Sequence, residues 1–308
     1  MQVSALSKYF ALIIIAAFII ALLTPATFMP ILPFIPYLLA VIMLVIGIHV
    51  KLKEFINVSH IKYQFIGAVI LKSILTALLA YFIGISLSLT TPELIGLIIV
   101  GACPGGTASN LMALLSRANL AFAVTLTIVT TLLAPIVMPS VIWAFLHTSI
   151  EVPFIGIIKT LILVTLLPII LGIIINCFLK LPDMVTQKLP LIAIIAITLI
   201  VMSVVALNRP EILHLPIKLF IGVVLLHIIA SFVGYLAGRA LKLDHPSRLS
   251  LLFEFSILDV GLGIVIAVLF FGKEAALAGT LYAVWQNIAG PIFVSILTRK
   301  SPSQPTAQ

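Results

Sequence analysis

The sequence predicts an all-α polytopic membrane protein: ten transmembrane helices in two inverted five-helix repeats, with helices 4 and 9 broken. Composition, the spacing of apolar stretches and a Pro-Gly-Gly interruption inside one of them predict this fold. Hydrophobic residues make up 63% of the 308 residues and charged residues 8%, whereas soluble domains carry about 25% charged residues. The composition therefore excludes a soluble globular enzyme.

Ten apolar stretches are predicted to span the membrane, which requires roughly 20 residues, and the first of them is short. The first is interpreted as a retained helix, because no small-residue cleavage site of a signal peptide follows it. The predicted spans are residues 10–24, 32–50, 65–87, 94–115, 120–146, 154–178, 189–207, 216–238, 249–271 and 276–298.

Basic residues are distributed unequally between the two sides of these spans. Only Arg209, Lys218 and Lys273 fall in loops on one side. The other side carries twelve: Lys8, Lys51, Lys53, Lys62, Arg117, Lys180, Lys188, Arg239, Lys242, Arg248, Arg299 and Lys300. Basic loops stay in the cytoplasm, so we expect both termini there, in a multi-pass protein of the cell (inner) membrane. The net charge of +8 then reflects topology and not nucleic-acid binding.

An internal repeat is visible in the second half of each predicted five-span unit. The segment 132–137 (LLAPIV) matches 288–293 (IAGPIF) at a shift of 156, which also places Gly105 on Gly261. Five spans per copy is an odd number, so the second copy enters the membrane inverted. The predicted repeats are residues 1–148 and 149–300, followed by a disordered tail at 301–308.

Two interruptions in apolar segments indicate a transporter. The first is 101–110 (GACPGGTASN) and the second is 259–263 (DVGLG). A membrane helix that breaks exposes backbone groups that lipid cannot satisfy, so the break must lie in protein or line a cavity. Broken helices at matching positions of two repeats indicate the binding site of a secondary transporter. No motif of an intramembrane enzyme is present, so we expect no catalytic residues.

Three charged residues lie well inside predicted spans: Lys72, Glu254 and Asp259. Each costs about 2.5–3.5 kcal/mol at mid-membrane and is a functional-site candidate for that reason. Their formal charges sum to −1, which favours a bound cation, although a structural ion pair of Lys72 with one acid stays open as an alternative. Sodium suits hard oxygen ligands, which the nearby Ser109, Asn110 and Thr127 offer.

Three further polar residues are candidates for contact with a solute. Thr107 begins the second half of broken helix 4, and Gln286 and Asn287 lie in the tenth span. Gln286 and Asn287 are equally compatible with hydrogen bonds between helices and with the lining of a cavity.

The segments CPGGTASN at 103–110 and VWQNIAG at 284–290, with the intramembrane Glu254 between them, resemble the bile acid:sodium symporter family. The resemblance implies ten spans in two inverted repeats. It also implies a panel domain from residues 1–64 and 149–211 and a core domain from 65–148 and 212–300. Sodium would bind behind the crossing of helices 4 and 9, and an organic anion would occupy the cavity between the domains.

The resemblance assigns residues to two sodium sites. The first site corresponds to Ser109, Asn110, Thr127 and Glu254, while a further serine of that site falls at Ala123. The two glutamines of the second site fall at Lys72 and Leu258, and the asparagine at the helix 9 break becomes Asp259. We therefore expect an ion pair of Lys72 with Asp259 to replace the second sodium.

The predicted function is secondary active transport of a small organic anion, bile-acid-like or a small carboxylate, with one coupling sodium at most and no other cofactor. A buried lysine can release its proton, so transport could also be proton-linked. The alternative is a cation/proton antiporter without an organic solute. Expected partners are the solute, sodium or protons, and membrane lipid. An unpaired Asp259 would repel a carboxylate; either Lys72 neutralises it, or the substrate is not a simple anion.

Overall fold

The computed structural model describes residues 13, 15–50, 61–147, 150–179, 182, 186, 188–213 and 216–299. Every element in this part of the chain is helical, and its only extended pairing is one isolated bridge between two loops. Residues 15–23 are helical. The elements that follow are α2 (Pro25–Phe28), the 3-10 helix η1 (Met29–Phe34), α3 (Ile35–His49), α5 (Lys62–Ser86), α6 (Thr91–Ala102), α7 (Thr107–Leu115), α8 (Leu120–Leu146), α9 (Phe154–Leu161), the π-helix η3 (Ile162–Leu166), α10 (Leu167–Leu179), α12 (Leu189–Leu207), α13 (Arg209–Leu213), α14 (Ile217–Ala240), α15 (His245–Ser256), α16 (Val260–Phe270) and α17 (Lys273–Arg299).

Six helical segments in the described ranges are long and apolar enough to cross a membrane: Pro25–His49, Lys62–Ser86, Leu120–Leu146, Phe154–Phe178, Ile217–Ala240 and Lys273–Leu297. Three shorter apolar helices accompany them, at Thr91–Ala102, Leu191–Leu207 and Val260–Phe270. The all-helical prediction is confirmed. The count of ten spans and the inverted repeat stay predictions. The tail at 301–308 and part of the first predicted span lie outside the described residues.

The second predicted span begins earlier than expected. The predicted spans left 25–31 out, but α2, η1 and α3 follow one another without a gap from Pro25 to His49. Proline lacks an amide hydrogen but fits the first turn of a helix. In this segment Pro25 and Pro36 lie in the first turns of their helices, and a 3-10 run carries Pro30 and Pro33.

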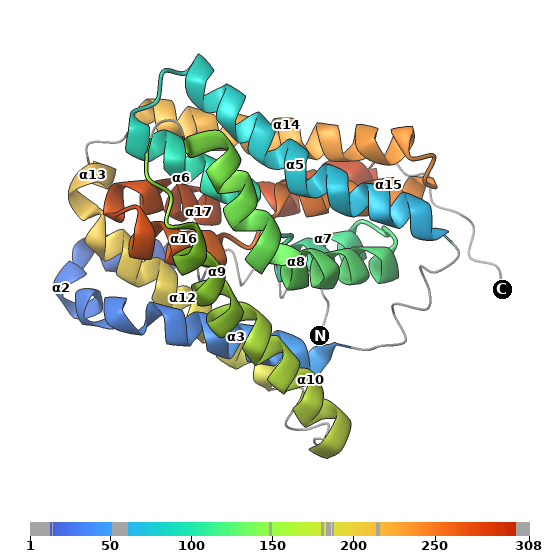
Figure 1. Cartoon of the computed structure of the whole chain (residues 1–308), viewed down its shortest axis with the longest axis horizontal. Coiled ribbons are helices and arrows are strands. Elements are labelled where there is room, and N and C mark those ends of the chain that lie inside the picture. The colour runs from blue at the N-terminus through green and yellow to red at the C-terminus, as the bar shows by residue number, and fades with distance from the viewer. Residues whose placement is uncertain are drawn as a thin grey trace.

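The helices pack in two groups (Figure 1). In one group α3 contacts α10 and α12, and α12 also contacts η1 and α2. In the other, α5 packs on α6, α8 and α14, while α15 packs on α14 and α7, and α17 on α6 and α16. Contacts of α12 with α17, and of α3 with α16, join the groups. The functional residues analysed below lie where the two groups face each other.

The outer surface of α5 carries large apolar side chains at every fourth position. Ile66, Ile70 and Ile74 are each about half exposed, at 53%, 51% and 49%. Residues four apart lie on the same helix face. An uninterrupted apolar stripe of this kind suits lipid and not water, which agrees with a membrane location.

The connections α5–α6 and α14–α15 are built alike. Two residues after the end of each first helix lies a non-glycine residue with positive φ, Ser88 (51°) after α5 and Lys242 (56°) after α14. Two residues later a polar residue precedes the next helix: the amide of Thr90 donates to Glu93 Oε2 (2.9 Å), and Asp244 Oδ1 accepts from an amide in the first turn of α15. Both α6 and α15 then have proline in their first turn.

Candidate functional site

Two helix interruptions contact each other through their backbones. The first, at residues 103–106, separates α6 from α7, and the second, at 257–259, separates α15 from α16. The amide of Gly106 donates to the carbonyl of Ile257, and the amide of Asp259 donates to the carbonyl of Pro104, both at 2.9 Å. Backbone groups freed by one interruption are thus satisfied by the other, which membrane depth requires.

The second interruption lies two residues earlier than predicted. The sequence analysis placed it at 259–263, but residues 260–263 form the first turn of α16. Asp259 is the N-cap of that helix, and its Oδ1 accepts a hydrogen bond from the amide of Leu262 (3.4 Å). Aspartate is a preferred N-cap residue, so the helix begins directly after it. Gly263 serves close packing, because a Cβ there would lie 2.7 Å from Cys103 Sγ.

Side chains of α5 satisfy the carbonyl groups at the end of α6. Lys72 Nζ donates to the carbonyl of Cys103 (2.6 Å), and Thr76 Oγ1 donates to the carbonyl of Gly101 (2.5 Å). Lys72 is only 1% exposed. The C-terminal end of a helix carries partial negative charge, so a buried ammonium is stabilised at this position.

The four residues predicted to bind a cation lie together. Glu254 is fully buried on α15, and its Oε1 accepts hydrogen bonds from Ser109 Oγ and from Thr127 Oγ1, the latter at 2.6 Å. Thr127 Oγ1 also lies 3.2 Å from Asn110 Oδ1. Helices α7, α8 and α15 therefore bring hydroxyl, amide and carboxylate oxygens to one point.

The second carboxylate oxygen of Glu254, Oε2, is buried and has no hydrogen-bond partner among the described residues. It faces the first interruption, where a Cβ on Gly105 would collide with it. A buried charged oxygen without a partner is costly. A small cation suits this position, since the surrounding donor set consists of hard oxygen atoms.

Lys72, Glu254 and Asp259, the three charged residues inside the predicted spans, all contact the segment 103–106. The predicted ion pair of Lys72 with Asp259, however, is not formed. In the described part of the chain Lys72 hydrogen-bonds only to Cys103 and Thr76, and its charge interacts with that of Glu254. Position on α5 explains this: the ammonium reaches the α6 end of the crossing, whereas Asp259 lies at the start of α16.

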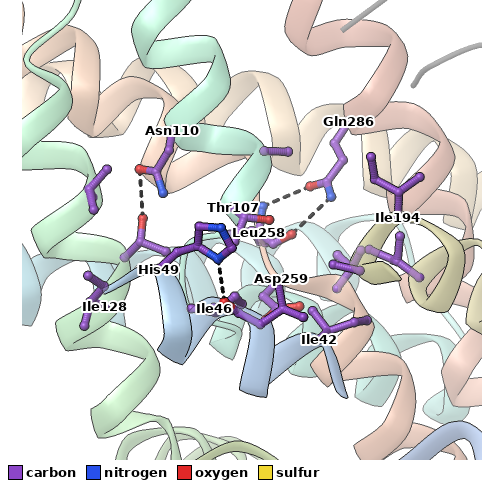
Figure 2. A pocket seen from close by; sticks show the side chains of 18 of the residues that line it. Ile42, Ile46, His49, Thr107, Asn110, Ile128, Ile194, Leu258, Asp259 and Gln286 are labelled. Carbon is purple, nitrogen blue, oxygen red and sulfur yellow. Dashed lines mark hydrogen bonds between the residues drawn. The ribbon is translucent and has the colours of Figure 1, made fainter. Parts of the chain in front are cut away.

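A cavity of about 490 Å³ opens beside the interruptions, between the two groups of helices (Figure 2). Helices α3 and α12 supply one wall, which is almost entirely apolar. The opposite wall comes from α7, α8, α17 and the start of α16. Asn110 and Thr127 belong both to this wall and to the oxygen cluster around Glu254, so a solute in the cavity would adjoin a cation at the cluster.

The predicted solute-contacting residues Thr107, Gln286 and Asn287 all line the cavity. Gln286 is already engaged: its Oε1 accepts from the amide of Leu258 (2.9 Å) and its Nε2 donates to the carbonyl of Leu258 (3.1 Å) (Figure 2). Asn287 Nδ2 donates to the carbonyl of Ala283 (2.7 Å). The side-chain oxygen of Asn287 takes no part in this hydrogen bond. Thr107 is exposed to the cavity at the start of α7.

The sequence analysis did not select His49, which also lines the cavity. Its Nδ1 lies 2.8 Å from the carbonyl oxygen of Val45 and its Nε2 lies 3.1 Å from that of Thr186. A neutral imidazole has one donor, so the tautomer decides which of the two carbonyl groups accepts a hydrogen bond. A histidine at the end of an apolar helix, near Lys51 and Lys53, resembled an ordinary loop residue in the sequence.

Replacing Gly105 by Ala is expected to weaken sodium binding about 5- to 150-fold, since overpacking a tight site costs about 1–3 kcal/mol. The added Cβ would meet the Glu254 carboxylate, which Ser109 and Thr127 hold in place. Gly261→Ala is a matched control, because its Cβ would meet only Asp259 Oδ1, at 3.5 Å. The measurement is the sodium concentration for half-maximal thermal stabilisation of the purified variants. Equal half-maximal sodium concentrations for the two variants would contradict the assignment of the sodium site to the oxygens around Glu254.

Comparisons with known proteins show the family of the chain. The model of the Sodium Bile acid symporter family matches residues 36–215. The chain belongs to this family. The chain is similar to the uncharacterized sodium-dependent transporter YocS of Bacillus subtilis (strain 168), with 32% identity over 277 residues, or 90% of this chain and 86% of that protein.

Two other relatives are similar at lower identity. The probable sodium/metabolite cotransporter BASS1 of Arabidopsis thaliana chloroplasts is 28% identical over 303 residues, covering 97% of this chain and 76% of the relative. Human sodium/bile acid cotransporter 4 is 26% identical over 233 residues, 72% of this chain and 53% of that protein. As a family member, the chain is a sodium-dependent transporter with several membrane helices.

Proposed function

We propose that the protein is a secondary active transporter that carries a small organic acid across the cell membrane together with one sodium ion. The observation that carries this proposal is the oxygen cluster of Ser109, Asn110, Thr127 and Glu254. Sodium at the cluster would take the buried Glu254 Oε2 as a ligand. Asn110 and Thr127 also line the cavity, so sodium at the cluster would hold their oxygens in position for the solute. Through these shared residues the binding of sodium would be coupled to the binding of the solute.

The proposed architecture is ten spans in two inverted repeats, with both termini in the cytoplasm. The like construction of the α5–α6 and α14–α15 connections, at Ser88–Thr90 and Lys242–Asp244, supports the repeat. The wall of α3 and α12 would belong to the panel domain and the wall of α7, α8, α16 and α17 to the core domain. Motion of one domain against the other would expose the cavity to each side of the membrane in turn, as in other inverted-repeat transporters.

Lys72 would take the place of a second sodium. Its ammonium is held by the Cys103 carbonyl at the first interruption and interacts electrostatically with Glu254. A fixed cation this close to the cluster repels another sodium, and it partly balances the buried carboxylate. One sodium at the cluster then brings the sum over Lys72, Glu254 and Asp259 from −1 to zero.

A sodium titration of the purified protein tests the proposal. Ligands that bind the folded state raise its thermal stability by mass action, so we expect saturable stabilisation by sodium with a Hill coefficient of about one. Potassium and choline at equal ionic strength are the controls. A coefficient of about two contradicts the single site. Proton movement driven by sodium in vesicles without organic solute would instead favour a cation/proton antiporter.

A further inference from the structure

The wall of the cavity carries a carboxylate, Asp259, which a site for a simple anion would not be expected to contain. Of the described residues that line the cavity, only His49 and Asp259 are ionisable. In the described part of the chain Asp259 has no ion-pair partner: its Oδ1 accepts one hydrogen bond, from the Leu262 amide. Lys72, the cation expected to neutralise it, is bound to the α6 end instead. A carboxylate facing the cavity without a cation repels a purely anionic solute and attracts a positively charged group.

The rest of the wall retains features that favour an acid group. The imidazole of His49 lines the cavity and carries no negative charge. The N-terminus of α7 meets the cavity at Thr107, and no acidic residue occupies its first turn. The N-terminus of α16, by contrast, already has the carboxylate of Asp259 as its cap. The cavity therefore presents both a positive and a negative region within apolar walls.

We propose that the transported solute is a zwitterion: an organic acid with an apolar body that also carries a cationic nitrogen, which Asp259 binds. This inference rests on the proposed function and specifies its substrate class. A cavity of about 490 Å³ lies within the range of small-molecule sites, about 300–1,000 Å³. With one sodium at the cluster the three buried charges sum to zero, and a zwitterion leaves that balance unchanged, whereas a simple anion adds a negative charge.

The test compares matched ligands on the purified full-length protein in saturating sodium. Two sets of three differ in the separation of their charges: phenylalanine with 3-phenylpropanoate and 2-phenylethylamine, and 4-(aminomethyl)benzoate with 4-methylbenzoate and 4-methylbenzylamine. Affinities come from calorimetry. We expect at least one zwitterion to bind at least about tenfold more tightly than its deaminated acid, because an ion pair replaces charge repulsion.

Asp259→Asn should reverse this preference, since the amide keeps the shape of the side chain and removes its charge. Zwitterion affinity should fall and that of the deaminated acid should rise, each about tenfold. Glu274→Gln is the matched control: it makes the same charge change at an exposed residue of α17 outside the cavity wall. A cooperative thermal unfolding transition in both variants shows that they are folded, and Glu274→Gln should also keep the wild-type response to sodium.

Three results would overturn the proposal. One is tighter binding of the deaminated acids by the wild-type protein, and another is the same preference in Asp259→Asn as in the wild type. The third is failure of every zwitterion to bind below about 10 mM, if sodium still stabilises the protein. That last result leaves the proposed sodium-coupled transport standing, whereas loss of the sodium response in the wild-type protein rejects the transport proposal itself.

Discussion

Replacing Glu254 by Gln is expected to abolish sodium-induced stabilisation and to lower sodium-dependent uptake about 100-fold. The amide keeps the size of the side chain and an oxygen that accepts from Ser109 and Thr127. It removes the negative charge that the buried cation requires. Loss of one partner from a buried charge pair costs about 3–5 kcal/mol, which corresponds to at least 100-fold in affinity. The measurements are a sodium-dependent thermal shift and uptake into proteoliposomes.

Glu274→Gln is again a suitable control for the Glu254 variant, because that carboxylate is exposed at the start of α17. The control should respond to sodium like the wild type. A Glu254→Gln protein that is folded and still stabilised by sodium at wild-type concentrations would show that the cluster is not the sodium site.

Lys72→Gln is expected to raise the sodium Hill coefficient from about one to about two, the limit for two sites. Glutamine can still donate to the Cys103 carbonyl, so the end of α6 keeps a hydrogen-bond partner. The fixed ammonium, however, is gone, and its repulsion of a second sodium near Glu254 goes with it. The coefficient is measured from the sodium dependence of uptake in proteoliposomes.

Lys159→Gln makes the same charge change on the exposed surface of α9 and serves as the control. It should leave the sodium dependence as it is. A Lys72→Gln protein that transports with an unchanged Hill coefficient would mean that Lys72 has a structural role at the interruption and does not replace an ion.

The parts of the site that follow from local chemistry were predictable from the sequence. Charges inside apolar segments identified Lys72, Glu254 and Asp259, because lipid tolerates such groups only where they are partnered. The interruption at 101–110 was equally clear, since Pro104, Gly105 and Gly106 cannot continue a helix. The cluster of Ser109, Asn110, Thr127 and Glu254 additionally required the family resemblance.

The side-chain partners could not be predicted in the same way. Whether Lys72 meets Asp259 or the end of α6 depends on how α5 is rotated and how deep it lies, and no local pattern encodes these. The exact start of α16 depends on two opposing preferences: Gly261 and Gly263 disfavour a helix, whereas Asp259 is a preferred N-cap residue. In the structure the N-cap prevails, and α16 begins directly after Asp259. His49 became visible as a cavity residue only because α3 packs opposite α7 and α17 across the cavity.

The ammonium of Lys72 is covalently attached, so it never crosses the membrane with the cargo. A sodium ion that enters down a tenfold gradient releases about 1.4 kcal/mol, and a potential of 100 mV adds about 2.3 kcal/mol. With one sodium, the steady-state accumulation of an uncharged or zwitterionic cargo is limited to roughly 500-fold under those conditions. A second mobile ion would square that ratio. The lysine thus sets a low thermodynamic ceiling, and the carrier can reverse and release its cargo when the sodium gradient falls.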